Sequence, residues 1–154
     1  MFRKIVWATD GSAGADHALG YARDLARANG AHLVVVHGEE MSGARSSIGY
    51  TRRVDEEDLE AKIKRQVAEM AESGLPVSVK VIGGHAHPAT LIAEVAEDMG
   101  ADLVVVGTRG HTPLVGLLLG SVTDRLLHIL HCPVLVVPLP AAGAGTDDAP
   151  GPDQ

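Results

Sequence analysis

Two groups of glycines in the last third of the chain have the residue types and the spacing expected of an anion-binding loop. Gly107-Thr108-Arg109-Gly110 directly follows an apolar run, and Gly120-Ser121 comes after nine further residues, where a helical pattern starts. Glycine lets the backbone approach a ligand closely, and the first N–H groups of a helix are unpaired donors with partial positive charge. The arrangement suits a phosphate, so the leading hypothesis is nucleotide binding. The alternative is ordinary loop structure, because the chain has 18 glycines.

Each position in this segment has its own expected role. Gly107 ends the apolar run, where a tight exit from a strand often needs a positive φ. Gly110 would let the backbone pass close to a ligand. Ser121 would cap the following helix or give its hydroxyl to a phosphate, and the N–H groups of Ser121 and Val122 would point into the site. Arg109 would neutralise phosphate charge through its planar guanidinium, with a solvated loop arginine as the alternative.

Asp10 is the acidic residue best placed to take part, because it directly follows the first apolar run. Three roles compete: a hydrogen bond to a ribose hydroxyl, a ligand for a divalent cation, or capping of the first helix together with Ser12. A bare carboxylate would repel phosphates, so its close approach needs a metal ion such as Mg²⁺ or Mn²⁺. We favour contact with the nucleotide over capping alone.

The amino-acid composition limits the kinds of protein that this chain can be. The 154 residues are 45% hydrophobic but only 3% aromatic, which predicts one globular domain with an aliphatic core. The formal net charge of −7 argues against nucleic-acid binding and means that a nucleotide would need local donors, a metal ion, or both. The single cysteine, Cys132, fits a reducing compartment and is interpreted as a core residue. Without an apolar segment of membrane-spanning length, the expected location is the cytoplasm.

Five short apolar runs alternate with helical patterns and predict an α/β fold. The expected strands are residues 4–9, 32–37, 77–82, 103–106 and 134–137. Gly30, Gly74 and Gly100 each stand between a helical run and a strand, the expected place for a left-handed helix end. The pattern β-α-β-α-β-α-β-α-β predicts an open parallel sheet with helices on both faces. A strand order of 3-2-1-4-5 would place the ligand where the first and fourth strands end.

Other segments carry weaker predictions. Residues 38–53 are polar and long enough for a mobile flap, and residues 139–154 are expected to form a disordered tail after a single domain over residues 1–138. His85, His87 and His111 invite a metal site, but exposed loop histidines are the favoured interpretation, because no acidic or thiol partner is near in sequence. The chain lacks a Gly-x4-Gly-Lys-Ser/Thr motif, which excludes a P-loop ATPase.

The last apolar run would form the edge of the proposed sheet. An uncovered apolar edge strand promotes aggregation, and pairing with a second copy across a two-fold axis would cover it. This predicts a homodimer through the residues of that run: Val134, Leu135, Val136 and Val137.

The pattern Gly-x2-Gly-x9-Gly-Ser resembles the nucleotide signature of the universal stress proteins, specifically their ATP-binding subgroup. The resemblance covers roughly residues 2–138 and includes the opening Ile5-Val6-Trp7-Ala8-Thr9-Asp10-Gly11-Ser12 and the ending Cys132-Pro133-Val134-Leu135-Val136-Val137-Pro138. It implies a Rossmann-like sheet of order 3-2-1-4-5, usually in a homodimer. It also implies ATP with its phosphates on Gly110, Gly120, Ser121 and Val122.

By the same resemblance, a set of residues at the strand ends would surround adenine and ribose. These are Ala8, Thr9, Asp10, Gly38, Val106 and Gly107. One position departs from the family, because Gly38 follows the strand-two histidine where an aliphatic residue such as valine is common. Burying a valine side chain is worth roughly 1.5–3 kcal/mol at most, so the departure would weaken affinity or selectivity for the base.

These observations predict an ATP-binding regulator of a stress response, and three alternatives stay open. The first is a slow, metal-dependent ATP hydrolase or phosphotransferase centred on Asp10. The second is a nucleotide-independent interaction protein that works through its dimer surface. The third is a sensor of AMP or cyclic AMP, because Gly38 leaves the base pocket less defined.

Overall fold

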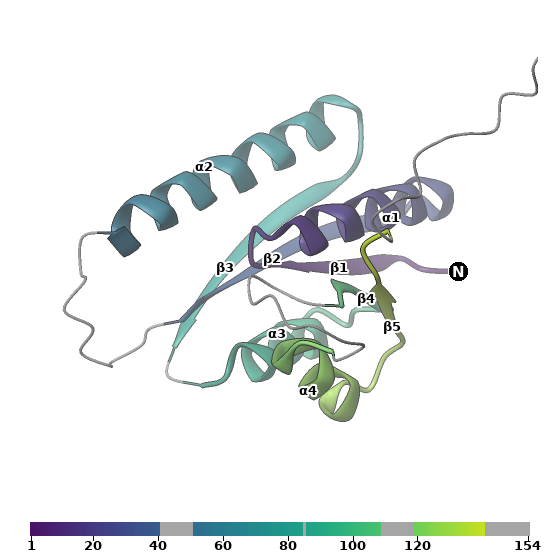
Figure 1. Ribbon diagram of the computed structural model, residues 1–154. Helices are drawn as coiled ribbons and strands as arrows, with labels where there is room; N and C mark the ends of the chain where they lie inside the picture. Colours follow the sequence, from purple (N-terminus) through teal and green to yellow (C-terminus); the bar gives the residue numbers. More distant parts are fainter. Residues whose placement is uncertain (41–50, 85, 109–118, 141–154) are drawn as a thin grey trace, which may run out of the picture.

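The computed structural model describes residues 1–40, 51–84, 86–108 and 119–140, without the side chains of residues 38–40 and 51–56. Five strands and four helices alternate along the chain (Figure 1). The strands are β1 (Lys4–Thr9), β2 (His32–Glu40), β3 (Val77–Gly84), β4 (Leu103–Gly107) and β5 (Val134–Val137). The helices are α1 (Ala13–Asn29), α2 (Thr51–Glu72), α3 (Pro88–Asp98) and α4 (Ser121–Ile129). All strand pairs are parallel and the order is β3-β2-β1-β4-β5, which confirms the predicted fold.

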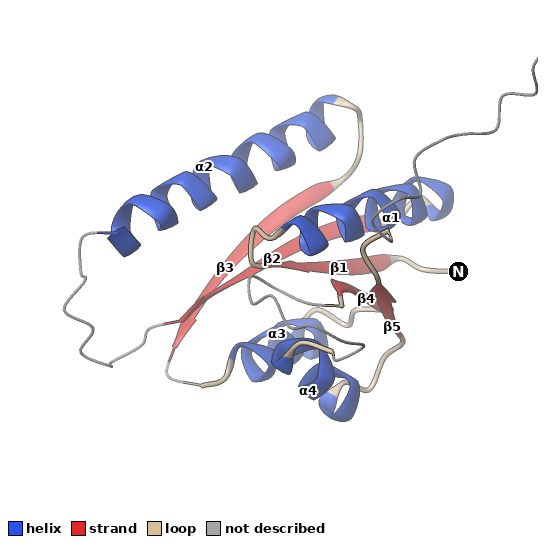
Figure 2. Ribbon diagram, in the orientation of Figure 1, coloured by secondary structure: helices blue, strands red, loops and turns tan. Residues whose placement is uncertain are grey.

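Both faces of the sheet are apolar, as expected for parallel strands covered on both sides. Helices α1 and α2 lie on one face, and α3 and α4 lie on the other (Figure 2). Along β1, Ile5 and Trp7 belong to the first core, whereas Val6 and Ala8 belong to the second. The buried stripe of α1 consists of small residues, mainly Ala18, Ala22 and Ala26, which lets this helix lie close to the strands.

The predicted helix ends are confirmed. Gly30, Gly74 and Gly100 have φ values of 61°, 82° and 61°, which lie in the left-handed region that favours glycine. Gly11 shares this conformation, with φ 77°, in the turn between β1 and α1.

The prediction of a flap over residues 38–53 is wrong at both ends. Strand β2 continues to Glu40 and pairs with β3 as far as the Glu40–Gly84 register, and α2 already begins at Thr51. Backbone ladder hydrogen bonds extend both strands past their last apolar residue, so a pattern of apolar side chains underestimates their length. Residues 41–50 of the predicted flap, and the predicted tail from residue 141 onward, lie outside the described residues.

One carboxylate, that of Asp102, links the amino ends of β1 and β4. Asp102 Oδ2 accepts hydrogen bonds from the backbone N–H groups of Arg3, at 2.6 Å, and Lys4, at 2.9 Å. These two donors hold the pKa of the Asp102 carboxyl below its ordinary value. They tie the start of β1 to the start of β4.

Cys132 is partly buried against the second core, and burial raises the pKa of its thiol. Within the described part of the chain, no helix is both long and apolar enough to cross a bilayer.

Candidate functional site

Strands β1 and β4 separate at their carboxyl ends. Their register runs from Ile5–Leu103 to Trp7–Val105 and stops there. Beyond that point β1 stays paired with β2 as far as Thr9–His37, while β4 stays paired with β5 as far as Gly107–Val137. Neighbouring strands whose connections leave to opposite sides form the switch point at which open parallel sheets bind ligands.

Most of the predicted site residues meet at this edge. Ala8 and Thr9 end β1, with 8% and 6% of their surface exposed, and Val106 and Gly107 end β4, both of them buried. Gly38 follows His37 on β2 and is in register with Ile82 of β3. The predicted site residues Arg109 and Gly110 lie outside the described residues, as do His85 and His111.

The two ends of the glycine segment are held against each other. Thr108 N donates to Val137 O at 3.1 Å, and Gly120 N donates to Thr108 O at 2.8 Å. The buried hydroxyl of Thr123 then donates to Gly107 O at 2.8 Å. The start of α4 is therefore fixed beside the end of β4, which is the strand-to-helix arrangement that the glycine spacing predicts.

Gly120, and not Ser121, is the N-cap of α4. Gly120 has the extended conformation of an N-cap residue and makes no side-chain capping bond, whereas Ser121 is the first helical residue. The expectation that Ser121 caps the helix is therefore wrong. Because a glycine cap offers no side-chain acceptor, it leaves the first N–H groups of the helix to another partner.

The role expected of Gly107 also needs correction. Its φ does not lie in the left-handed region, so the strand exit does not need glycine for that reason. A Cβ at this position would instead lie 2.8 Å from the carbonyl carbon and oxygen of Gly14, in the first turn of α1. Gly107 is required because β4 and α1 approach each other backbone to backbone.

Asp10 belongs to a hydrogen-bonded turn between β1 and α1. Its Oδ1 accepts from Ser12 N at 3.0 Å, while Ser12 Oγ caps α1 by accepting from Ala15 N at 3.2 Å. Gly11 N donates to Thr9 Oγ1 at 3.0 Å. Asp10 therefore holds the N-cap residue Ser12 in place but is not itself the N-cap. This hydrogen bond also holds the Asp10 carboxylate at the carboxyl end of β1.

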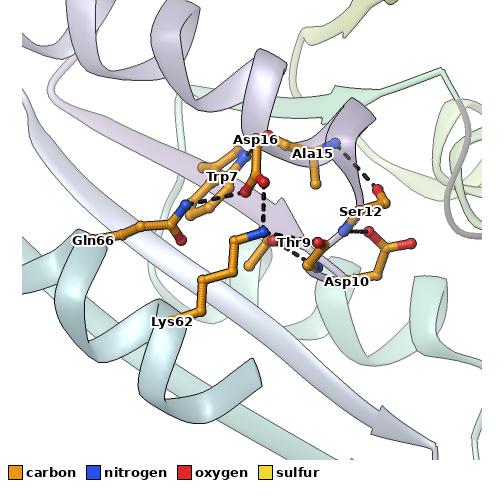
Figure 3. A network of polar contacts seen from close by, with 9 residues as sticks. Trp7, Thr9, Asp10, Ser12, Ala15, Asp16, Lys62 and Gln66 are labelled. Atoms are coloured by element: carbon orange, nitrogen blue, oxygen red, sulfur yellow. Dashed lines mark hydrogen bonds and ion pairs between the residues drawn. The ribbon is translucent and has the colours of Figure 1, made fainter. Parts of the chain in front are cut away.

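A cluster of polar residues that sequence reasoning missed surrounds this turn (Figure 3). Lys62 and Gln66 of α2 reach Asp16 of α1, and Lys62 also reaches the carbonyl of Gly11. Beneath the same part of α1, the indole N–H of Trp7 donates to Ala15 O at 3.0 Å. The side chains of Lys62 and Asp16 are only about one-third exposed, at 33% and 34%.

Two buried or capping histidines have structural partners. His37, which is 6% exposed, lies with Nδ1 at 3.0 Å from Thr9 O, so this nitrogen carries the proton. His87 is the N-cap of α3, and its Nδ1 accepts from Ala89 N at 3.2 Å. Among the described residues, no group of three or more His, Cys, Asp or Glu side chains could hold a metal ion.

The model of the universal stress protein family matches residues 1–138. The chain belongs to the universal stress protein family. Its relative MJ0531 from Methanocaldococcus jannaschii is 35% identical over 146 residues, an alignment that covers 91% of this chain and 84% of that protein.

Solved structures agree with this assignment. The structure of the hypothetical protein MJ0577 from the same organism is 27% identical, with a TM-score of 0.77, and covers 92% of this chain and 99% of that one. A universal stress protein in complex with cAMP has a TM-score of 0.67 and covers 88% and 97% of the two chains. At 24% identity, this second likeness concerns the fold alone.

Proposed function

We propose that this universal stress protein is an ATP-binding regulator. In this proposal the phosphates lie on the backbone of Gly110, Gly120, Ser121 and Val122. The observation that carries it is the start of α4, which has a glycine cap and is fixed by Thr123 beside the end of β4. A helix N-terminus with unpaired N–H groups at a switch point is a favourable place for phosphate.

Adenine and ribose would lie across the ends of β1, β2 and β4. Asp10 supplies a carboxylate for the ribose or for a Mg²⁺ or Mn²⁺ ion that accompanies the phosphates. The contacts to adenine are the less specific part of the proposed site, because Gly38 offers only its backbone where the family commonly has an aliphatic side chain. AMP or cyclic AMP is the second candidate ligand, because both carry the same adenosine as ATP and Gly38 leaves the choice among them open; a universal stress protein of the same fold was solved with cAMP.

Titration of the purified protein with ATP by calorimetry tests the proposal. We expect saturable binding that is lost in Gly120→Val, because a branched side chain at the N-cap covers the N–H groups that the phosphates need. Parallel titrations with AMP and cyclic AMP, with and without Mg²⁺, identify the preferred nucleotide. Absence of binding up to millimolar ATP, a limit of about −4 kcal/mol, would refute the proposal.

A phosphate-release assay on the same samples distinguishes a regulator that only binds ATP from an enzyme that hydrolyses it. A regulator binds ATP without turnover, so we expect no metal-dependent release of phosphate above the background of a blank. Metal-dependent phosphate release that disappears in Asp10→Ala would instead support a slow hydrolase centred on this carboxylate.

We also propose that the protein is a homodimer that pairs through β5. Val104 N donates to the Pro133 carbonyl and Thr108 N donates to the Val137 carbonyl. Because the backbone groups of a strand alternate in direction, the N–H of Val136 points away from β4. At this position proline removes an outward backbone donor and no hydrogen bond to β4. We therefore expect a dimer by analytical ultracentrifugation and a folded monomer for Val136→Pro. A wild-type chain that sediments as a monomer at micromolar concentration would contradict the dimer.

A further inference from the structure

Lys62 connects α2 to the turn that carries Asp10. Its ammonium group donates to the carbonyl of Gly11 at 3.0 Å and to Asp16 Oδ2 at 2.5 Å (Figure 3). A two-thirds buried lysine usually has a specific set of acceptors, because an ammonium removed from water needs compensation. Here the compensation comes from a carboxylate and from one particular backbone carbonyl.

The Gly11 carbonyl belongs to a turn in which other polar groups are already engaged. Gly11 N donates to Thr9 Oγ1, and Ser12 N donates to Asp10 Oδ1, both at 3.0 Å. Gly11 itself has a φ of 77°, a conformation that a side chain would strain. The orientation of the Asp10 carboxylate therefore depends on the orientation of the Gly11–Ser12 peptide, whose oxygen Lys62 holds.

A second contact fixes Lys62 relative to α1. Gln66, one turn further along α2, donates to Asp16 Oδ1 at 3.0 Å while Lys62 takes Oδ2. Both oxygens of one carboxylate in the first turn of α1 are thus bound by two residues of α2. Together with Ile63 and Met70 of α2, which are buried in the same core as α1, these contacts hold the place from which Lys62 reaches Gly11.

We propose that Lys62 is a positioning residue of the nucleotide site, which orients the Asp10 carboxylate by holding the Gly11 carbonyl. The inference rests on the proposed function in so far as Asp10 contacts the nucleotide. It extends the site to α2, an element that contributes none of the residues proposed to touch the ligand. Lys62 acts through Gly11 and Asp10 and does not contact phosphate.

Hydrogen exchange of the nucleotide-free protein tests the structural part of the inference. In Lys62→Met, which keeps a long side chain but removes the donor, we expect the amides of Gly11 and Ser12 to exchange about tenfold faster, because their turn opens more often. Lys64→Met is the matched control, since Lys64 lies on the same helix and forms an exposed ion pair with Glu60. Unchanged exchange of Gly11 and Ser12 in Lys62→Met would overturn the inference whether or not the protein binds ATP.

Binding measurements test the functional part. We expect Lys62→Met to raise the Kd for adenosine and for ATP by the same factor, about fivefold, because Asp10 serves the nucleoside half of the ligand. Lys64→Met should leave both values unchanged. Both titrations are run in metal-free buffer, so that Asp10 cannot act through a cation. A loss for ATP but not for adenosine would then mean that Lys62 contacts phosphate directly and would overturn the positioning role. Absence of binding by the wild-type chain would refute the proposed function and leave the exchange result standing.

Discussion

Replacing Trp7 with alanine is expected to lower the free energy of unfolding by about 3–5 kcal/mol. Trp7 is the largest of the fully buried side chains and lies in the core between β1 and α1. The truncation removes its contacts and leaves a cavity that the alanines of α1 are too small to fill. It also removes the hydrogen bond from the indole N–H to Ala15 O, in the first turn of the same helix.

Urea unfolding followed by circular dichroism measures this loss, because Trp7 is the only tryptophan and the variant has no indole fluorescence. Trp7→Phe is the graded control: it keeps much of the volume and loses the N–H, so its destabilisation should be clearly smaller. Tyr21→Ala controls for the general effect of removing an aromatic residue, since Tyr21 is 51% exposed on α1. A loss below about 1 kcal/mol for Trp7→Ala would contradict the packing described for this core.

The fold could be predicted because its signals are local. The apolar runs at the strands, the alanine stripe of α1 and the glycines that end the helices each specify one element without knowledge of the others. The rules for parallel crossovers then leave few strand orders. The ends of β2 and β3 could not be predicted in this way, because Glu40 and Gly84 are in strands only through the backbone hydrogen bonds that each gains from its neighbour.

The candidate site was predictable where it depends on strand ends and not where it depends on contacts between helices. Asp10 and Gly107 follow apolar runs, so their places at the carboxyl edge follow from the topology. Lys62 is 51 positions from Gly11, and its contact depends on how α2 is rotated and how far it slides along α1. Charged residues surround Lys62 on α2, and a sequence pattern cannot tell which of them faces inward.

A positive φ is not the reason for the glycine at the end of β4. A positive φ is the usual explanation for a glycine in a loop motif, and it depends only on the local conformation of the chain. The explanation in this molecule is the backbone of Gly14, which lies in a helix that precedes β4 by more than 70 residues in the sequence. Two glycines that are distant in sequence and face each other leave no signal in a single chain.

Gly107→Ala is consequently expected to destabilise the protein by about 1–3 kcal/mol, the usual cost of inserting a methyl group into a packed interior. The new Cβ would meet Gly14 backbone atoms at 2.8 Å, and backbone cannot rotate away as a flexible side chain does. Either β4 or α1 must shift. A shift of β4 moves the Gly107 carbonyl that Thr123 holds, so the start of α4 should move with it.

Gly20→Ala is the matched control for this substitution. Gly20 lies within α1 and has open space around its Cβ position, so alanine should stabilise the protein by up to about 1 kcal/mol through helix propensity. Opposite signs for the two glycine-to-alanine changes, measured by urea unfolding, would support the close approach of β4 to α1. Equal small effects would contradict it. Because Gly107 holds α4 through Thr123, its variant should also weaken ATP binding, whereas the Gly20 variant should bind like the wild type.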